Sequence, residues 1–303
     1  MNRYIPIACH ESYKLDLPKG HRFPMEKYKL LPNELINQGI SKETDFFSPY
    51  PPELNCVTQV HDKEYVLKLK SLKLTKPEIR KIGFPLSKEL IDREFLIAGG
   101  TVMGADKALT YKISMNIAGG THHSFSDRGE GFCLLNDQAI AAKYLLKNHA
   151  INKILIVDLD VHQGNGTASI FKSIEQVFTF SMHGDKNFPF KKEKSDLDIG
   201  LKDNTTDIEY LTILKKILPL LIKKVRPNFI FYLSGVDVIK TDKLGRLSLT
   251  LEGCKDRDKF VFSLCKKENI PVQCSMGGGY SEDISVIVDA HLNTYKMAKE
   301  VYF

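Results

Sequence analysis

Three metal-type residues lie within five positions after an apolar run, as Asp158, Asp160 and His162 in the segment VDLDVH. Alternate residues of a strand share a face, so Asp160 and His162 are expected to point the same way. Catalytic zinc takes three protein ligands and keeps one position open, and Asp237, which follows another apolar run, would supply the third. The alternative is that these residues only cap the next helix. Burying several such groups without partners would be costly, so the pattern favours a metal site.

A divalent ion held by two carboxylates and one imidazole forms a site without net charge. Such a site is expected to acidify water weakly, and it would need a separate base and a donor for the oxyanion. The adjacent His122 and His123, which follow glycines, are candidates for proton transfer, and Tyr280 after three glycines is a candidate donor. The alternatives are a chance polar pair in a loop and a packed aromatic side chain.

These residues all follow short apolar runs, which the pattern predicts to be strands. The runs cover residues 113–119, 153–157, 177–180, 228–233 and 271–276. In open α/β sheets, ligands bind just beyond the carboxyl ends of the strands. The candidate residues are therefore expected to converge if these strands are neighbours in one sheet.

Segments with helical spacing separate the apolar runs, and this alternation predicts a parallel sheet flanked by helices. The expected helices cover residues 87–111, 136–148, 166–171, 207–225, 252–268 and 283–299. Pro219 is expected to kink or divide one of them. The first eighty residues are irregular, with a helix start expected after Pro24 and helical spacing over 60–72. No linker is visible, so we predict a single α/β domain over residues 1–303.

Composition limits the possible classes of protein. The chain has 303 residues, of which 43% are hydrophobic and 26% charged, which is typical of a globular protein rather than a disordered or fibrous one. The net charge of +6 is spread along the chain, so no nucleic-acid partner is expected. No run approaches the ~20 apolar residues of a membrane helix. The six cysteines form no CxxC pair, and we expect a reducing, cytoplasmic location.

Four motifs, in the same order, resemble those of the histone deacetylase superfamily, which has the arginase-like α/β fold. They are GGTHHSFSDRGEGFCLLND, VDLDVHQGNG, SGVD and GGGY. The resemblance runs from about residue 95 to the C-terminus. HRFPMEKY and VHDKEY in the N-terminal part also look like the smaller class IV branch and its bacterial relatives.

The resemblance implies hydrolysis of an acylated lysine side-chain amide, with Asp160, His162 and Asp237 as zinc ligands. It implies that His123 is the general base and acid and that Tyr280 polarises the acyl carbonyl. It also implies that His122 acts electrostatically and that Asp158 is the carboxylate partner of His122. Gly131 and Phe132 would form the wall of the acyl-lysine channel. Fe²⁺ is the alternative ion in such a site. A structural K⁺ held by the DLDVH backbone and Ser181 is also implied.

The sequence departs from many relatives at two positions. Asn165 stands where they have a carboxylate partner for the second histidine, and Gln163 replaces a common histidine. An amide still orients His123 but stabilises its charged form less. Class IV relatives resemble the chain here, so activity is expected. Phe188 is the candidate for the second aromatic wall of the channel. Class IV relatives are associated with long fatty acyl groups as well as acetyl, so acyl length stays open.

Three other functions compete with lysine deacylation. An amidohydrolase for acetylpolyamines would use the same residues, but such relatives often carry an inserted loop, and no long insertion is visible. The second is a non-catalytic module that binds acyl-lysine. Missing metal ligands or a missing Tyr280 would favour it, but all of these residues are present. An arginase-like ureohydrolase is the third, and it needs two metals and more aspartates. The substrate protein and the oligomeric state are not predicted.

Overall fold

The computed structural model describes residues 4–303, and its strands form one parallel sheet with the order β2-β1-β3-β8-β7-β4-β5-β6. The strands are β1 (Ile7–Ala8), β2 (Phe46–Phe47), β3 (Ile113–Asn116), β4 (Ile154–Asp158), β5 (Val177–Gly184), β6 (Leu197–Leu201), β7 (Phe229–Leu233) and β8 (Val272–Ser275). The predicted α/β fold is therefore confirmed, and the five expected runs are β3, β4, β5, β7 and β8. The short strands β1, β2 and β6 had not been predicted.

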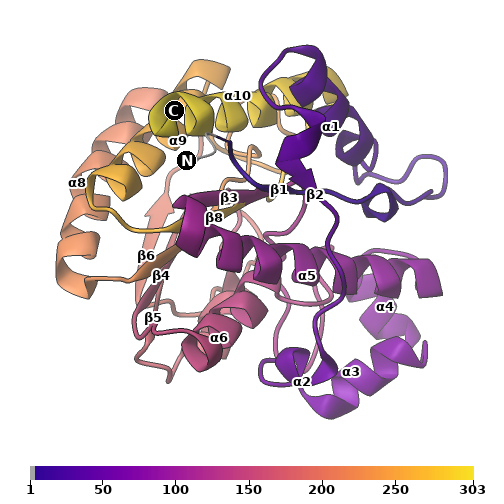
Figure 1. Cartoon of the computed structure of the whole chain (residues 1–303). Helices are drawn as coiled ribbons and strands as arrows, with labels where there is room; N and C mark the ends of the chain where they lie inside the picture. The colour runs from indigo at the N-terminus through magenta and orange to yellow at the C-terminus, as the bar shows by residue number, and fades with distance from the viewer. Residues whose placement is uncertain (1–3) are drawn as a thin grey trace.

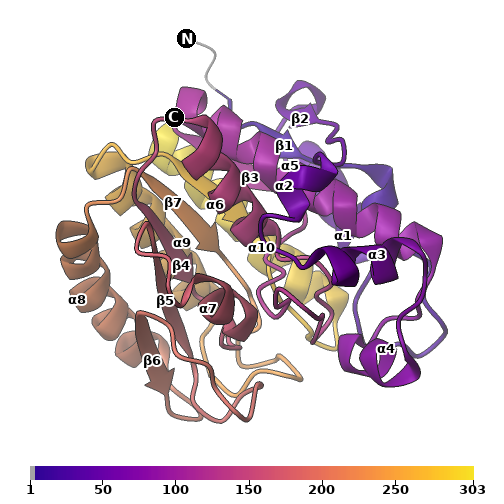
Figure 2. The same cartoon turned by 90° about the horizontal axis from the view of Figure 1, so that it is seen from below.

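Helices cover both faces of this sheet (Figure 1). They are α1 (Lys27–Asn37), α2 (Leu54–Val57), α3 (Lys63–Lys70), α4 (Lys76–Ile82), α5 (Lys88–Tyr111), α6 (Asp137–Asn148), α7 (Asn165–Phe171), α8 (Asp207–Val225), α9 (Leu251–Lys267) and α10 (Ile284–Tyr302). α5 packs on α6 along one face, and α8, α9 and α10 form a row on the other. Seen from below, the N-terminal helices α1 to α4 gather on one side of the molecule (Figure 2).

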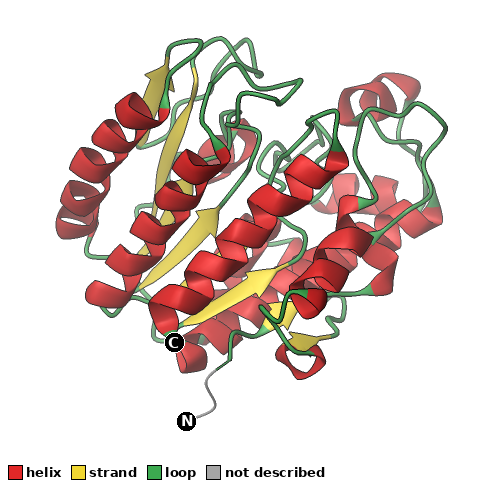
Figure 3. Cartoon of the chain, turned by 90° about the horizontal axis from the view of Figure 1, so that it is seen from above, coloured by secondary structure: helices red, strands yellow, loops and turns green. Residues whose placement is uncertain are grey.

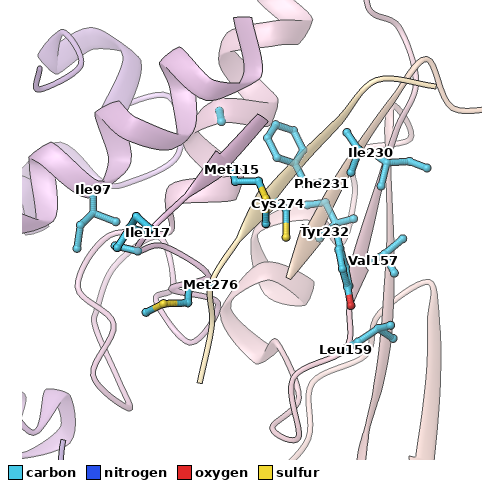
Figure 4. Close-up of a cluster of buried hydrophobic side chains, with 14 of the residues drawn as sticks. Ile97, Met115, Ile117, Val157, Leu159, Ile230, Phe231, Tyr232, Cys274 and Met276 are labelled. Carbon is cyan, nitrogen blue, oxygen red and sulfur yellow. The ribbon is translucent and has the colours of Figure 1, made fainter. Parts of the chain in front are cut away.

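The central strands are apolar because both of their faces are buried. β4 and β7 are buried at every position, and their register pairs Val157 with Tyr232. Side chains from four neighbouring strands, including Met115, Val157, Phe231 and Cys274, meet in one continuous core (Figure 4). This double burial explains why the strands appear in the sequence as unbroken apolar runs rather than as alternating patterns.

α8 continues through Pro219 as one helix from Asp207 to Val225, so the prolyl residue does not divide it. Leu214 and Leu218 are buried before the proline, and Leu221 and Ile222 are buried after it. α8 also packs against α9. We infer that burial on both sides of Pro219 outweighs the hydrogen bond that the proline removes.

The parallel strands all end at the same edge of the sheet, and long loops gather there (Figure 3). The C-terminus lies at the opposite end of the strands. β3, β8, β7 and β4 are neighbours in that order, so the loops that follow them are brought side by side. The fold thereby creates the convergence that the sequence pattern predicts.

A buried arginine in α9 fastens two of these loops. The Arg257 guanidinium donates hydrogen bonds to the carbonyl oxygens of Leu159 (3.2 Å), Gly235 (2.7 Å) and Ser234 (3.1 Å). Its Nε donates to Asp258 at 2.8 Å, and neither side chain of this pair is exposed. One cation therefore satisfies three carbonyl groups at the ends of β4 and β7.

We predict that Arg257→Met lowers the free energy of unfolding by about 3–5 kcal/mol, because it leaves Asp258 as a buried charge without its cation. Urea unfolding followed by circular dichroism measures the change. The control is Lys259→Met in the same helix, where the partly exposed pair with Glu300 is lost and little change is expected. Equal stability of the two variants would show that Arg257 does not fasten the loops.

Candidate active site

The three candidate metal ligands are buried together beyond the ends of β4 and β7. Asp160, His162 and Asp237 offer ligand atoms that all lie within 4.8 Å of one another. His162 Nδ1 is 3.0 Å from Asp160 Oδ1 and 3.1 Å from Asp237 Oδ2. Side-chain nitrogen and carboxylate oxygen atoms at this spacing are suited to share one divalent ion.

The charges of this cluster also fit a cation. Burial, and then repulsion from Asp160, raises the pKa of Asp237 to about 7. The N–H groups of Val161 and Gly278 donate to Asp237 Oδ1 (2.9 Å) and Asp160 Oδ2 (2.8 Å). Backbone dipoles thus orient both carboxylates, while a divalent ion would remove the remaining cost of ionising two neighbouring buried acids.

The glycine run that precedes Tyr280 has a steric reason. A Cβ atom at Gly278 would overlap with Asp237 Oδ2 and lie 2.8 Å from Asp160 Oδ2. Only glycine lets the β8 loop pass this close to the two carboxylates and still donate its N–H to one of them. The loop then places the Tyr280 ring 6.3 Å from the ring of His162, measured between centroids.

The two adjacent histidines contact different partners. His122 Nδ1 is 2.7 Å from Asp158 Oδ2, and His123 Nδ1 is 2.7 Å from Asn165 Oδ1. Because an amide oxygen only accepts hydrogen bonds, His123 Nδ1 carries a proton and leaves Nε2 free to accept one. The His123 ring lies 5.9 Å from that of His162, so this nitrogen belongs to a ring beside the candidate metal ligands.

These partners push the two pKa values apart. Burial opposes the charged form of His122, but Asp158 and Asp160 outweigh this effect and raise its pKa. Burial lowers the pKa of His123 well below its ordinary value, and the charges of His122 and His162 lower it further. One histidine therefore favours the charged form and the other the neutral form. Paired titratable groups with opposite shifts are typical of acid–base sites.

Aromatic side chains line the approach to this cluster. The Phe188 and His123 rings are 4.9 Å apart, and the Phe132 and Tyr280 rings are 6.0 Å apart, both between centroids. Gly131 has a φ of +52°, and a Cβ there would lie 2.7 Å from His123 Cδ2, so glycine keeps the wall clear of the histidine. Gly131, Phe132, Phe188 and His123 thus line the same cavity, and the role of the first three as walls of a substrate channel stays a prediction.

The approach has a small inner part and a wide outer part. An inner cavity of about 40 Å³ adjoins His123, Asp160, His162 and Tyr280. An outer cavity of about 540 Å³ opens beyond Gly131, Phe132, Phe188 and Tyr280. The candidate catalytic groups therefore lie between a broad mouth and a confined end.

Two contacts of the Tyr280 loop had no signal in the sequence pattern. Asp242 Oδ2 accepts a hydrogen bond from the Tyr280 N–H at 2.5 Å. Lys27 is fully buried, and its Nζ donates to the Gly277 carbonyl oxygen at 3.3 Å. Burial lowers the pKa of Lys27 to about 8. Lys27 is 250 positions from Gly277, and only the fold brings these residues together.

The residues of the expected potassium site lie beside this cluster. Ser181 of β5 pairs with Asp158 of β4 in the sheet register, and Ser181 Oγ is 2.9 Å from His183 Nδ1. Gln163, the second departure from many relatives, forms hydrogen bonds with the backbone N and O of Glu193 in the loop after β5 and with the Asp198 side chain in β6. The structural K⁺ itself stays a prediction.

The run KKEK at residues 191–194 lies in the loop between β5 and β6 and is only partly exposed. Lys192 is half-buried, and its Nζ donates to the carbonyl oxygens of Asp185, Asn187 and Pro189 at 2.7–2.9 Å. Lys191 and Lys194 are exposed. Lys192 therefore holds together the loop that carries Phe188.

Comparisons with known proteins agree with this geometry. The chain is 41% identical to an uncharacterized protein of Picosynechococcus over 98% of its own length and 99% of that protein. It is 30% identical to Histone deacetylase B of Dictyostelium discoideum, covering 90% of this chain and 71% of the relative. It is 27% identical to Histone deacetylase 2 of Arabidopsis thaliana, covering 94% of this chain and 76% of the relative.

Among the helices of residues 4–303, none combines the length and the apolar character needed to cross a membrane.

The family model described as "Histone deacetylase domain" matches residues 21–295, which include every residue of the cluster described above. The chain therefore belongs to the histone deacetylase family and is a hydrolase of carbon–nitrogen amide bonds.

Proposed function

We propose that the protein hydrolyses the side-chain amide of acylated lysine and uses Zn²⁺ held by Asp160, His162 and Asp237. The observation that carries this proposal is the buried ligand cluster, with the rings of His123 and Tyr280 both beside His162. A zinc ion bound there would act as a Lewis acid on the acyl carbonyl and would acidify water. Fe²⁺ is the alternative ion for the same residues.

The residues of the chain supply the proton transfers. His123 Nε2 accepts a proton as water attacks the acyl carbon, and the Tyr280 hydroxyl donates a hydrogen bond to the oxygen that becomes negative. Burial, and then Asp237 and Asp160, raises the pKa of Tyr280 well above its usual value, so the hydroxyl keeps its proton. His123 then gives its proton to the lysine nitrogen as the carbon–nitrogen bond breaks. The second proton of the water leaves the carboxylic acid and passes to the amine, so the products are a lysine ammonium group and a carboxylate.

The inner cavity supports a preference for short acyl groups. Its volume of about 40 Å³ is less than a tenth of the 540 Å³ of the outer cavity. A fatty acyl chain would need this region to open. The class IV resemblance makes fatty acyl groups the alternative substrates, and chain length belongs in the first test.

The test of the function is turnover of lysine peptides that carry acyl groups from acetyl to long fatty acyl, with acetylpolyamines alongside. Chelator-sensitive release of free lysine, fastest from acetyl peptides, is expected. Turnover of polyamines alone would move the protein to the small-amine hydrolases. A folded, metal-loaded chain without any turnover would favour a binding module instead.

We predict that His123→Ala lowers kcat by ~10²–10⁴, because the general base is lost. Metal content, measured by elemental mass spectrometry, should stay unchanged, since His123 is not among the three candidate ligands. His149→Ala, which removes a half-buried histidine at the end of α6, is the control and should retain activity. Near-normal turnover by His123→Ala with metal bound would remove His123 from the mechanism.

Tyr280→Phe should lower kcat by about 10²–10³ while substrate binding is largely kept, because only the donor to the oxyanion is lost. Steady-state kinetics, together with peptide binding by fluorescence anisotropy, separates the two effects. If binding fails and kcat of the remaining complex is normal, the tyrosine acts only in packing.

Asn165→Asp should move the acidic limb of the kcat/KM profile to higher pH. A carboxylate would stabilise the protonated His123 ring and raise its pKa, so the neutral base would appear only at higher pH. In the natural chain the lowered pKa of His123 keeps the base neutral to lower pH. The control is Asn148→Asp, which adds the same charge at the exposed end of α6. An unmoved limb would contradict the assignment of that limb to His123.

A further inference from the structure

The outer mouth of the channel is lined by cations from separate parts of the chain. Arg22 comes from the segment before α1, Lys81 from α4, Lys186 from the loop after β5, and Lys243 and Arg246 from the loop after β7. Among the described residues, no aspartate or glutamate lines the same cavity. The mouth therefore concentrates positive charge on a protein whose charge is otherwise spread along the sequence.

Nearby carboxylates neutralise only part of this charge. Asp203 is shared by Lys186 (3.9 Å) and Arg246 (3.2 Å), and Glu282 lies 3.7 Å from Lys243. In residues 4–303, no carboxylate lies within 4.0 Å of Arg22 or Lys81. Five cations thus face two carboxylates.

The base of the channel would not offset this charge. With a divalent ion bound, the two ionised carboxylates and a neutral His162 give a site with no net charge. Asp242 lies close by but is buried beneath the mouth, where its oxygens accept the N–H groups of Tyr280, Leu244 and Gly245. A substrate entering the mouth therefore meets a positive field.

We propose that the mouth binds acidic residues on both sides of the acyl-lysine, so that the protein acts on acylated lysines in acidic peptide segments. This inference rests on the proposed function and names its substrate class. The cations are distributed over separate segments of the chain, which suits an extended peptide better than one compact anion. Phe190 is 89% exposed at the same mouth and offers apolar contact to a peptide chain. Lysine-rich segments would be repelled.

The experiment compares three peptides with the same central acetyl-lysine, flanked by Glu and Asp, by Ser and Gly, or by Lys and Arg. For the full metal-loaded chain, kcat/KM should be about tenfold higher for the acidic than for the basic peptide, and the difference should shrink at high salt. Equal rates, a preference for the basic peptide, or better turnover of cationic acetylpolyamines would overturn the inference while keeping an active enzyme. No turnover of any substrate would overturn the proposed function.

Binding of the same three peptides, measured by fluorescence anisotropy, decides the charge preference independently of turnover. The acidic peptide should bind most tightly, and equal affinities would overturn the inference.

Variants locate the effect at the mouth. Lys81→Gln with Lys243→Gln should lower kcat/KM for the acidic peptide by about three- to tenfold, and by less for the neutral peptide. Lys216→Gln removes an exposed charge in the middle of α8, does not line the mouth, and should change neither rate. A double variant that keeps the full preference for acidic peptides would overturn the assignment to these residues.

Discussion

Two carboxylates buried side by side are the constraint on which the rest of the structure depends. Asp160 and Asp237 lie beneath the surface at the ends of neighbouring strands, where ionising both is costly without a cation. The loops around them serve to hold these acids: backbone N–H groups orient the oxygens, and Gly278 permits the close approach of its own N–H. Arg257 then fixes the carbonyl groups of the loops from below. These contacts hold the carboxylate oxygens in place, which would give a bound ion a defined geometry.

The same cluster sets the behaviour of the two histidines. They are adjacent in the chain and equally buried, so burial alone would lower both pKa values. A carboxylate beside His122 reverses the shift, whereas the amide of Asn165 orients His123 without adding charge. The difference between an aspartate and an asparagine thus separates a charged histidine from a neutral one. In this chain the neutral ring is the one with a free nitrogen to accept a proton.

Much of the fold could be predicted from the sequence, because fully buried parallel strands appear as apolar runs and their ends collect the polar residues. The ligands, the tandem histidines and Tyr280 follow such runs, and their convergence needed only that the strands be neighbours. Other parts could not be predicted. Arg257 and Asp242 contact backbone atoms, which are the same in every residue type, so no sequence pattern marks these contacts. Lys27 contacts Gly277, which lies 250 positions away along the chain. β6, whose residues are mostly half-buried, lacks the apolar run that marked the central strands.

The base and the mouth of the channel would recognise different parts of the substrate by different physical properties. In the proposed function, a divalent ion at the base would cancel the charge of the two ionised acids, so the site would favour a neutral group such as an amide. The small inner cavity would then limit the acyl part of that amide. At the mouth, lysines and arginines from four parts of the chain leave a positive surplus that acts on whatever flanks that amide. Residues of the base are tied to one another by short hydrogen bonds, so changing one disturbs the chemistry. The cations of the mouth are exposed and come from separate segments, so their number can change without touching the base. A preference for the residues that flank the acyl-lysine could therefore change without a change in the chemistry at the base.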